Sequence, residues 1–244
     1  MHAAEPPIPR IPQALLAFVA GYVDSCTFLA LFGLYVAQVT GSFVVVGAEI
    51  VADSTGLAVH VLAVPVFALA AVLTALVVAR AGRNRTAVVW TLILENLLLI
   101  AFFAAVLLQR PASGPDAPAV LLASMFGLAA MGVQSASVRM LSGGGGSTNV
   151  MTTNTTQAAI DATEWALAWC ARRREPNDAA ARDRVVVARS RCGGLLLLIG
   201  SFLAGTILGA AAYALFGVRC LVAPIALLIA LTGWAIWTRQ RQQA

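Results

Sequence analysis

Residues 131–164 read MGVQSASVRMLSGGGGSTNVMTTNTTQAAIDATE, and this stretch decides the fold. A long apolar run leads into it, and four glycines at 143–146 break the helix. Nine of the eleven residues at 147–157 are Ser, Thr, Asn or Gln. The chain as a whole is 60% hydrophobic and only 11% charged. A polar, glycine-broken segment inside such a chain predicts a specialised element rather than an ordinary loop.

The composition predicts a membrane protein. The chain has 244 residues, and its mean hydropathy is +0.85. A soluble domain of that length needs a more highly charged surface than this chain supplies. Several apolar runs approach the ~20 residues that carry a helix across ~30 Å of hydrocarbon. The expected fold class is therefore all-α, a polytopic transmembrane helical bundle with the lipid bilayer as its partner.

The charged residues and cysteines exclude several other classes. The net charge of +5 comes from sixteen arginines without a lysine, which indicates cytoplasmic loops facing anionic headgroups. No basic face alternates with aromatic residues, so no nucleic-acid partner is expected. The four cysteines are scattered and form no CxxC, which predicts buried thiols rather than a disulfide framework or a metal site. No metal and no cofactor are expected.

Six apolar runs are predicted to span the membrane. They cover residues 14–35, 57–79, 86–108, 119–141, 192–216 and 220–237. The segment 36–53 is too polar at its start to span alone, a helix is expected around 156–170, and 171–191 is predicted to be a charged loop. Residues 14–238 thus form a single transmembrane domain between an N-terminal tail (1–13) and a C-terminal tail (239–244).

The arginines predict the topology. The segments richest in arginine are 80–85, 172–191 and the C-terminus, and all three should be cytoplasmic. The chain then reaches residue 142 and leaves residue 171 on the same side. Two crossings would need roughly 40 residues, and fewer are available. The stretch between them is therefore expected to be re-entrant or to lie along the interface, and both termini are expected to be cytoplasmic.

The two polar segments indicate an internal repeat. The first half has Gly21, Asp24, the triplet Thr40-Gly41-Ser42 and Glu49, and the second half has Gly132, Ser135, the triplet Thr152-Thr153-Asn154 and Asp161. Each unit, about 14–110 and 119–238, reads as span, dip, span, span, and the odd number of crossings makes the two units inverted. Inverted repeats with broken helices are a recurring transporter plan. The alternative is chance self-similarity in Gly/Thr/Ala-rich membrane sequence.

At these motifs the chain resembles the YoaK family of bacterial six-helix membrane proteins, a domain of unknown function. The resemblance covers about 15–237 and rests on two segments: Gly21-Tyr-Val-Asp24-Ser-Cys-Thr-Phe28 followed by Thr40-Gly41-Ser42, and Gly132-Val-Gln134-Ser-Ala-Ser-Val138-Arg139. Ser42 departs from the amide of the family's T-G-N, and the second triplet lacks its glycine. The resemblance implies a location in the bacterial inner membrane and an uncharacterised function, without a substrate.

Two acidic positions are candidate functional groups. Asp24 is expected at mid-depth, where insertion scales put the cost of a carboxylate at roughly 2.5–3.5 kcal/mol. Arg139 is one possible partner, although its side chain could equally extend to the headgroups. Asp24 is then either a functional group or part of a structural ion pair that joins the two repeats. Glu95, followed by Asn96, lies near the centre of the third span. A buried glutamate there either binds protons during transport or packs between helices.

The two polar triplets are expected to precede short helices. Backbone N–H groups and the positive end of a helix dipole suit an anion, whereas simple capping by Ser, Thr and Asn is the alternative. Glu49 and Asp161 are expected to be exposed at the ends of the dips. The expected solute-binding set is Asp24, Thr40, Gly41, Ser42, Glu95, Gln134, Arg139, Thr152, Thr153 and Asn154.

Enzyme signatures are sparse. The only histidines are His2 and His60, and no G-x-S-x-G, H-E-x-x-H or Walker sequence occurs, so no catalytic residue is assigned. The sequence favours a transporter or channel for a small polar or anionic solute. A non-transporting scaffold or assembly subunit is the first alternative, and an intramembrane enzyme is the second. Small residues such as Ser201, Gly205 and Gly209 suit helix packing and a homo-oligomer.

Overall fold

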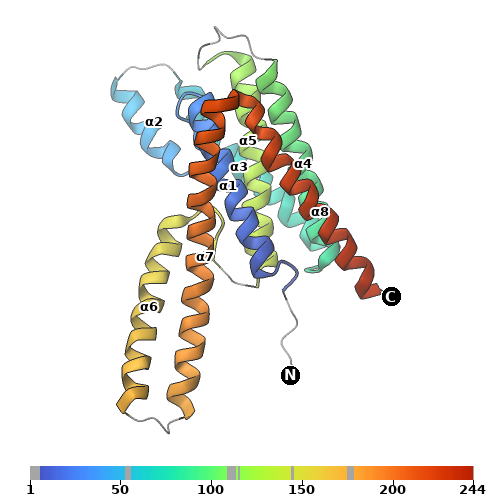
Figure 1. The fold of residues 1–244 in the computed structure, drawn as a ribbon. Helices are drawn as coiled ribbons and strands as arrows, with labels where there is room; N and C mark the ends of the chain where they lie inside the picture. The colour runs from blue at the N-terminus through green and yellow to red at the C-terminus, as the bar shows by residue number, and fades with distance from the viewer. Residues whose placement is uncertain are drawn as a thin grey trace.

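The computed structural model describes residues 6–52, 56–108, 114, 116–143, 146–174 and 179–243. Within these ranges the chain is helical and contains no strand (Figure 1). The helices are α1 (Arg10–Ala30), α2 (Gly41–Ala52), α3 (Leu57–Ala81), α4 (Arg85–Leu107), α5 (Pro118–Leu141), α6 (Met151–Arg174), α7 (Ala179–Phe216), the 3₁₀ helix η1 (Gly217–Leu221) and α8 (Val222–Gln243).

The expected class of all-helical bundle is confirmed. Helices α1, α3, α4 and α5 are each long and apolar enough to cross a membrane, and so is the stretch Arg182–Arg241. That stretch contains most of α7 together with η1 and α8, and Figure 1 shows α7 and α8 running in opposite directions. The stretch therefore supplies two of the six predicted spans. Helix α1 begins at Arg10, inside the predicted N-terminal tail.

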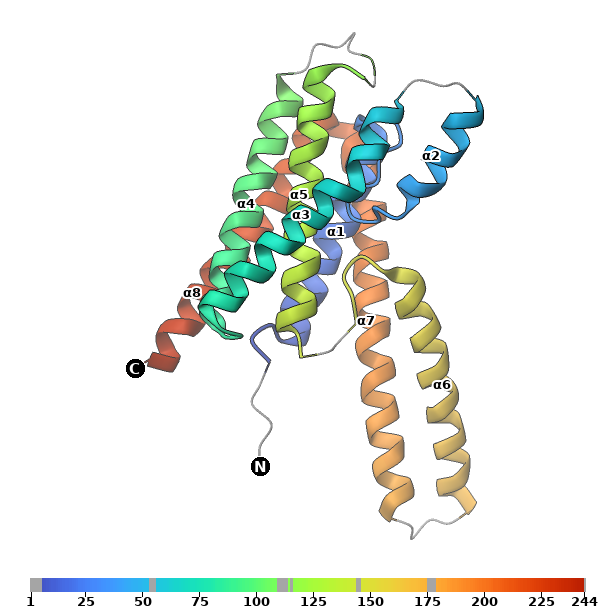
Figure 2. The same cartoon turned by 180° about the vertical axis from the view of Figure 1, so that it is seen from behind.

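The helices pack in pairs that match across the two halves. Helix α1 packs along α7, α5 packs between α3 and α4, and α4 packs along α8. Fully buried Leu99, Phe102, Leu128 and Met131 lie in the core of the bundle. Figures 1 and 2 show α1 running upward, and α5, which the sequence aligns with α1, running downward. This is the arrangement expected of inverted repeats.

The aligned glycines Gly21 and Gly132 each allow a close contact between helices, one in each half of the chain. A Cβ atom on Gly21 would clash with the Phe202 carbonyl oxygen of α7, and one on Gly132 would lie 2.7 Å from the Phe67 carbonyl oxygen of α3. Each glycine thus allows its helix to approach the backbone of its neighbour closely. Such close approach through small residues is typical of helices packed in a membrane.

Helix α2 has the length of a broken element rather than a span. Its 12 residues rise only about 18 Å, well short of the ~30 Å of a bilayer core. Figure 2 shows it beginning part-way along the bundle and ending near the start of α3. Helix α2 is therefore too short to cross a bilayer by itself, in agreement with the prediction that its segment does not span alone.

Helix α6 enters and leaves the bundle at the same end. Figure 2 shows that it begins above the lower ends of α1 and α5 and then runs well below them. This arrangement agrees with the predicted re-entrant character at the start of the segment. The rest of α6 pairs with the first half of α7 to form a helical hairpin that projects beyond the bundle (Figures 1 and 2).

The prediction of a charged loop at 171–191 is wrong, because α6 continues to Arg174 and α7 begins at Ala179. Val185, Ala188 and Cys192 are buried at helical spacing on the face of α7 toward α6. Arg182, Arg184 and Arg189 lie on the exposed side of the same helix. The segment 171–191 is rich in arginine, but one face of its helix is apolar and buried.

Candidate functional site

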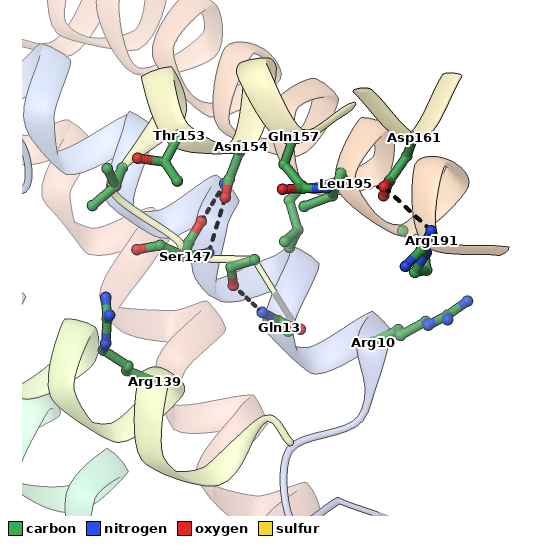
Figure 3. Close-up of a pocket in the computed structure, with 14 residues that line it drawn as sticks. Arg10, Gln13, Arg139, Ser147, Thr153, Asn154, Gln157, Asp161, Arg191 and Leu195 are labelled. Atoms are coloured by element: carbon green, nitrogen blue, oxygen red, sulfur yellow. Dashed lines mark hydrogen bonds and ion pairs between the residues drawn. The ribbon is translucent and has the colours of Figure 1, made fainter. Parts of the chain in front are cut away.

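A pocket lies where the hairpin meets the bundle (Figure 3). It has a cavity volume of about 690 Å³ and is formed by the start of α1, the end of α5, residues 146–150, the first half of α6 and the middle of α7. Its polar side chains belong to Arg10, Gln13, Arg139, Ser147, Thr153, Asn154, Gln157, Asp161 and Arg191. We refer to this site as the arginine pocket.

The polar stretch after the glycines folds onto the start of α6 through Asn154. The buried Asn154 side chain accepts a hydrogen bond from the Ser147 backbone N–H at 3.1 Å and donates one to the Ser147 carbonyl at 2.5 Å. Gln13 of α1 donates a hydrogen bond to the Gly146 carbonyl. The wall of the pocket is thus fastened to both α6 and α1, as Figure 3 shows.

Gly146 packs closely against three side chains at this wall. A Cβ atom at position 146 would lie 2.6 Å from a methyl carbon of Leu195, 2.8 Å from Asn154 Oδ1 and 2.9 Å from a methyl carbon of Leu198. A side chain there would push these side-chain ends aside, including the Asn154 oxygen that accepts from the Ser147 N–H. The glycine run therefore includes a packing position, in addition to the break in the helix that the sequence predicted.

The lining of the pocket carries more positive than negative charge. Three arginines line it against one carboxylate, that of Asp161. Arg191 Nη2 lies 3.7 Å from Asp161 Oδ1 and also pairs with Glu164, while Gln157 donates to Asp161 at 2.9 Å. The excess charge therefore resides on Arg10 and Arg139, and a concave site of one sign attracts ions of the opposite sign.

The two remaining arginines differ in how they are held. Arg10 donates from Nη2 to the Ser190 hydroxyl at 2.9 Å, which leaves other N–H groups of its guanidinium for a ligand. Arg139 is exposed and has no ion pair within the described part of the chain. Figure 3 shows it extending from α5 toward Ser147. Arg139 is therefore the best placed cation for direct contact with an anion.

Of the ten expected site residues, the structure places Arg139, Thr153 and Asn154 at this pocket. Thr152 is exposed in the first turn of α6 and is not part of the lining. Both threonines lie inside the helix rather than before it, because α6 begins at Met151. Only Thr153 and Asn154 of the second triplet thus line the pocket, and a solute-binding role for them stays a prediction.

Asp24 does not pair with Arg139, which corrects one of the expectations above. Its Oδ1 accepts hydrogen bonds from the backbone N–H groups of Val36 and Ala37, both at 2.8 Å. Its Oδ2 accepts from Gln38 Nε2 at 3.3 Å. These donors stabilise the buried carboxylate without a counter-ion. Asp24 therefore fixes the turn that leads into α2.

Two backbone N–H groups of the first triplet are already paired. The N–H groups of Gly41 and Ser42, and that of Phe43 directly after the triplet, donate to the carbonyls of Gln38, Val39 and Thr40 at 3.0, 3.1 and 3.2 Å. The Ser42 hydroxyl lies 3.4 Å from His60 Nδ1 of α3. The free donors expected at this dip are therefore used within the turn, and a solute-binding role for the triplet stays a prediction.

Glu95 and Gln134 lie inside the bundle, away from the arginine pocket. Glu95 is fully buried in α4, and among the described residues neither of its carboxyl oxygens has a hydrogen-bond partner. The adjacent Asn96 donates to Thr232 Oγ1 of α8 at 3.1 Å. Gln134 donates to the Leu16 carbonyl at 2.7 Å and so joins α5 to α1. The structure thus separates these residues from the three at the pocket.

Sequence reasoning missed Arg10, Gln13, Gln157, Asp161 and Arg191 as lining residues. Asp161 was expected to be exposed, but it is buried and paired with Arg191. Its equal spacing from the polar triplet in both repeats was the available signal. Arg10 and Arg191 were assigned to a tail and to a loop, and only the packing of α1 on α7 brings them together.

A family model described as a protein of unknown function (DUF1275) matches residues 13–234, so the chain belongs to this family. No curated protein and no solved structure matches the chain. The matched residues run from Gln13 at the arginine pocket to Trp234 in the middle of α8, so they include both halves of the bundle. The family match and the apolar helices together indicate an uncharacterised membrane protein.

Proposed function

We propose that this DUF1275 protein is a membrane transporter or channel whose arginine pocket admits a small anionic solute. The observation that carries the proposal is the convergence of Arg10, Arg139 and Arg191 on one cavity whose lining has a single carboxylate. A guanidinium binds carboxylate or phosphate groups through paired N–H donors. The amide of Gln157 and the hydroxyl of Thr153 add neutral donors on the same lining.

The orientation of the pocket follows from the arginines. Figure 1 shows that the start of α1, the end of α5, the turn from α3 to α4 and the end of α8 all lie at one end of the molecule, with the hairpin projecting from it. Arg10, Arg80, Arg83, Arg139 and Arg241 lie at this end. The positive-inside rule assigns that end to the cytoplasm. The pocket would then open to the cytoplasmic side of a bacterial inner membrane.

The inverted packing supports transport rather than binding alone. Helices α2 and α6 both begin part-way along the bundle and run toward its opposite ends (Figure 2). The packed pairs α1–α7 and α3–α5 correspond across the two halves. In transporters built from inverted repeats, broken elements of this kind approach the substrate path from both sides. The resemblance to the YoaK family, carried by the motifs on α1 and α5, fits the same arrangement.

Binding of a labelled anion tests the site. We expect detergent-solubilised protein to bind inorganic phosphate, sulfate or succinate saturably in equilibrium dialysis. Arg139→Gln should weaken the binding by about tenfold, which is the loss of one charge-assisted hydrogen bond at an exposed position. Arg83→Gln is the matched control, since Arg83 is an exposed arginine at the same end but outside the pocket. Absence of saturable binding for all three anions would contradict the proposal.

One observation favours the alternative of a non-transporting scaffold. The projecting hairpin exposes Trp165, Leu167 and Trp169 on α6, with 40%, 67% and 44% of their surfaces accessible. Exposed apolar groups beyond the membrane-spanning bundle suit contact with another protein. Anion flux into liposomes distinguishes the two functions, because a scaffold would pass none of the three anions above the rate of empty vesicles.

A further inference from the structure

Two of the four cysteines meet inside the structure although 194 residues separate them in the chain. Cys26 Sγ of α1 lies 3.2 Å from Cys220 Sγ of η1, and the two side chains are only 1% and 5% exposed. Cys26 Sγ also lies 3.6 Å from the Gly209 carbonyl, and the Tyr22 hydroxyl donates to the Cys220 carbonyl at 3.1 Å. The contact is therefore held by packing on both sides of the pair.

Close approach of α1 and α7 creates this contact. A Cβ atom on Gly209 would lie 2.6 Å from the Tyr22 carbonyl oxygen, and one on Gly205 would clash with the Phe18 carbonyl. Because both positions are glycine, the two helices lie nearly backbone to backbone. Cys26, one turn beyond Tyr22, is thereby brought against the turn between α7 and α8 that carries Cys220.

The pair lies at the end of the bundle opposite the arginines. Figure 1 shows the end of α1 and the turn from α7 to α8 together at that end, whereas α6 and the first half of α7 project from the other. If the arginine-rich end faces the cytoplasm, the pair faces the extracytoplasmic side, where disulfides form and persist. The other two cysteines, Cys170 and Cys192, belong to the cytoplasmic hairpin, and Cys192 Sγ contacts the Ala158 carbonyl instead of a thiol.

We propose that Cys26 and Cys220 are a disulfide-forming site that fastens α1 to the 3₁₀ turn between α7 and α8. The oxidant is a disulfide of the extracytoplasmic compartment, either a protein disulfide or a small-molecule one. The thiolate of one cysteine attacks a sulfur of the oxidant and releases one thiol. The second cysteine attacks the mixed disulfide, so the Cys26–Cys220 bond forms and the oxidant leaves as two thiols that carry the two protons.

The burial of both sulfurs sets the order of events. The exchange takes place while α1 is docking on α7 and η1, when the thiols can still be reached by the oxidant. Once the helices close, the same packing shields the bond from soluble reductants. The disulfide should therefore resist dithiothreitol in the folded protein and become reducible only after denaturation.

Counting thiols in unreduced membranes tests the site. Cells are quenched with acid and then N-ethylmaleimide, the membranes are dissolved in SDS, and the intact mass of the protein gives the number of alkylated cysteines. Of the four cysteines, we expect only Cys170 and Cys192 to be alkylated before reduction and all four after reduction in SDS. A linked peptide containing Cys26 and Cys220 should be found by mass spectrometry.

Two variants provide controls. Cys170→Ser with Cys192→Ser should show no alkylation until the protein is reduced, while Cys26→Ser should leave all its remaining cysteines alkylated without reduction. Four alkylated cysteines in the unreduced wild-type protein would overturn the proposal, and so would a disulfide that links any other pair. This measurement does not depend on anion binding, so it stands or falls separately from the transport proposal.

Discussion

Replacing Asp24 tests whether its carboxylate has a structural role or takes part in transport. In Asp24→Ala, the N–H groups of Val36 and Ala37 lose the oxygen that accepts both at 2.8 Å. Val36 and Ala37 are buried, so water does not replace that acceptor. Each buried donor left unpaired costs roughly 1–3 kcal/mol, and the pair therefore costs roughly 2–6 kcal/mol. We expect a correspondingly large loss in the free energy of unfolding.

Asp24→Asn is the matched variant, because its side-chain oxygen still accepts both N–H groups. It exchanges charge-assisted hydrogen bonds for neutral ones, but it also removes a buried charge, and Gln38 can turn its amide to present an oxygen. We therefore expect a loss of about 1 kcal/mol or less. Titration with SDS in mixed micelles unfolds each protein and gives the free energy of unfolding of both variants. Wild-type stability in Asp24→Ala, or abolished anion flux in a stable Asp24→Asn protein, would refute the structural role.

Three further substitutions test the packing of the bundle and the buried carboxyl group of α4. Gly132→Ala places a methyl group 2.7 Å from the Phe67 carbonyl and should cost roughly 1–3 kcal/mol of stability. Gly200→Ala on α7 meets nothing within 4 Å and should be neutral or stabilising, so equal effects of the two changes would contradict the close packing of α3 on α5. Glu95→Gln removes a buried carboxyl group that has no hydrogen-bond donor among the described residues, so stability should be retained or increased. Lost anion flux in a stable Glu95→Gln protein would instead assign this residue to proton movement.

The sequence predicted the spans well, because each apolar run ends at residues that a membrane interior excludes. Helices α3, α4 and α5 begin and end within a few residues of their predicted limits; α3 lies between two capping glycines, α4 begins at an arginine and α5 begins at a proline. The alignment of Gly21 with Gly132 has a counterpart in the structure. A Cβ atom at either position would meet a backbone carbonyl of the neighbouring helix, a contact that the sequence alignment did not itself predict.

The wrong predictions concern contacts that the spacing of residues in the sequence does not determine. Asp24 and Arg139 invited an ion pair by charge alone, but the backbone after α1 turns back and offers its own N–H donors to the carboxylate. Arginine density at 172–191 suggested a loop, although Val185, Ala188 and Cys192 mark one buried helical face. The arginine pocket combines Arg10 with Arg191, and only the packing of α1 on α7 brings them together.

Anion uptake into proteoliposomes tests the central claim most directly. Wild-type protein, Arg139→Gln and Arg83→Gln are reconstituted at equal density, and the entry of labelled phosphate, sulfate and succinate is followed. We expect uptake of at least one anion above empty vesicles, a reduction of about tenfold at low anion concentration in Arg139→Gln, and no change in Arg83→Gln. Equal uptake by all three proteins, or no uptake of any of the anions, would contradict it.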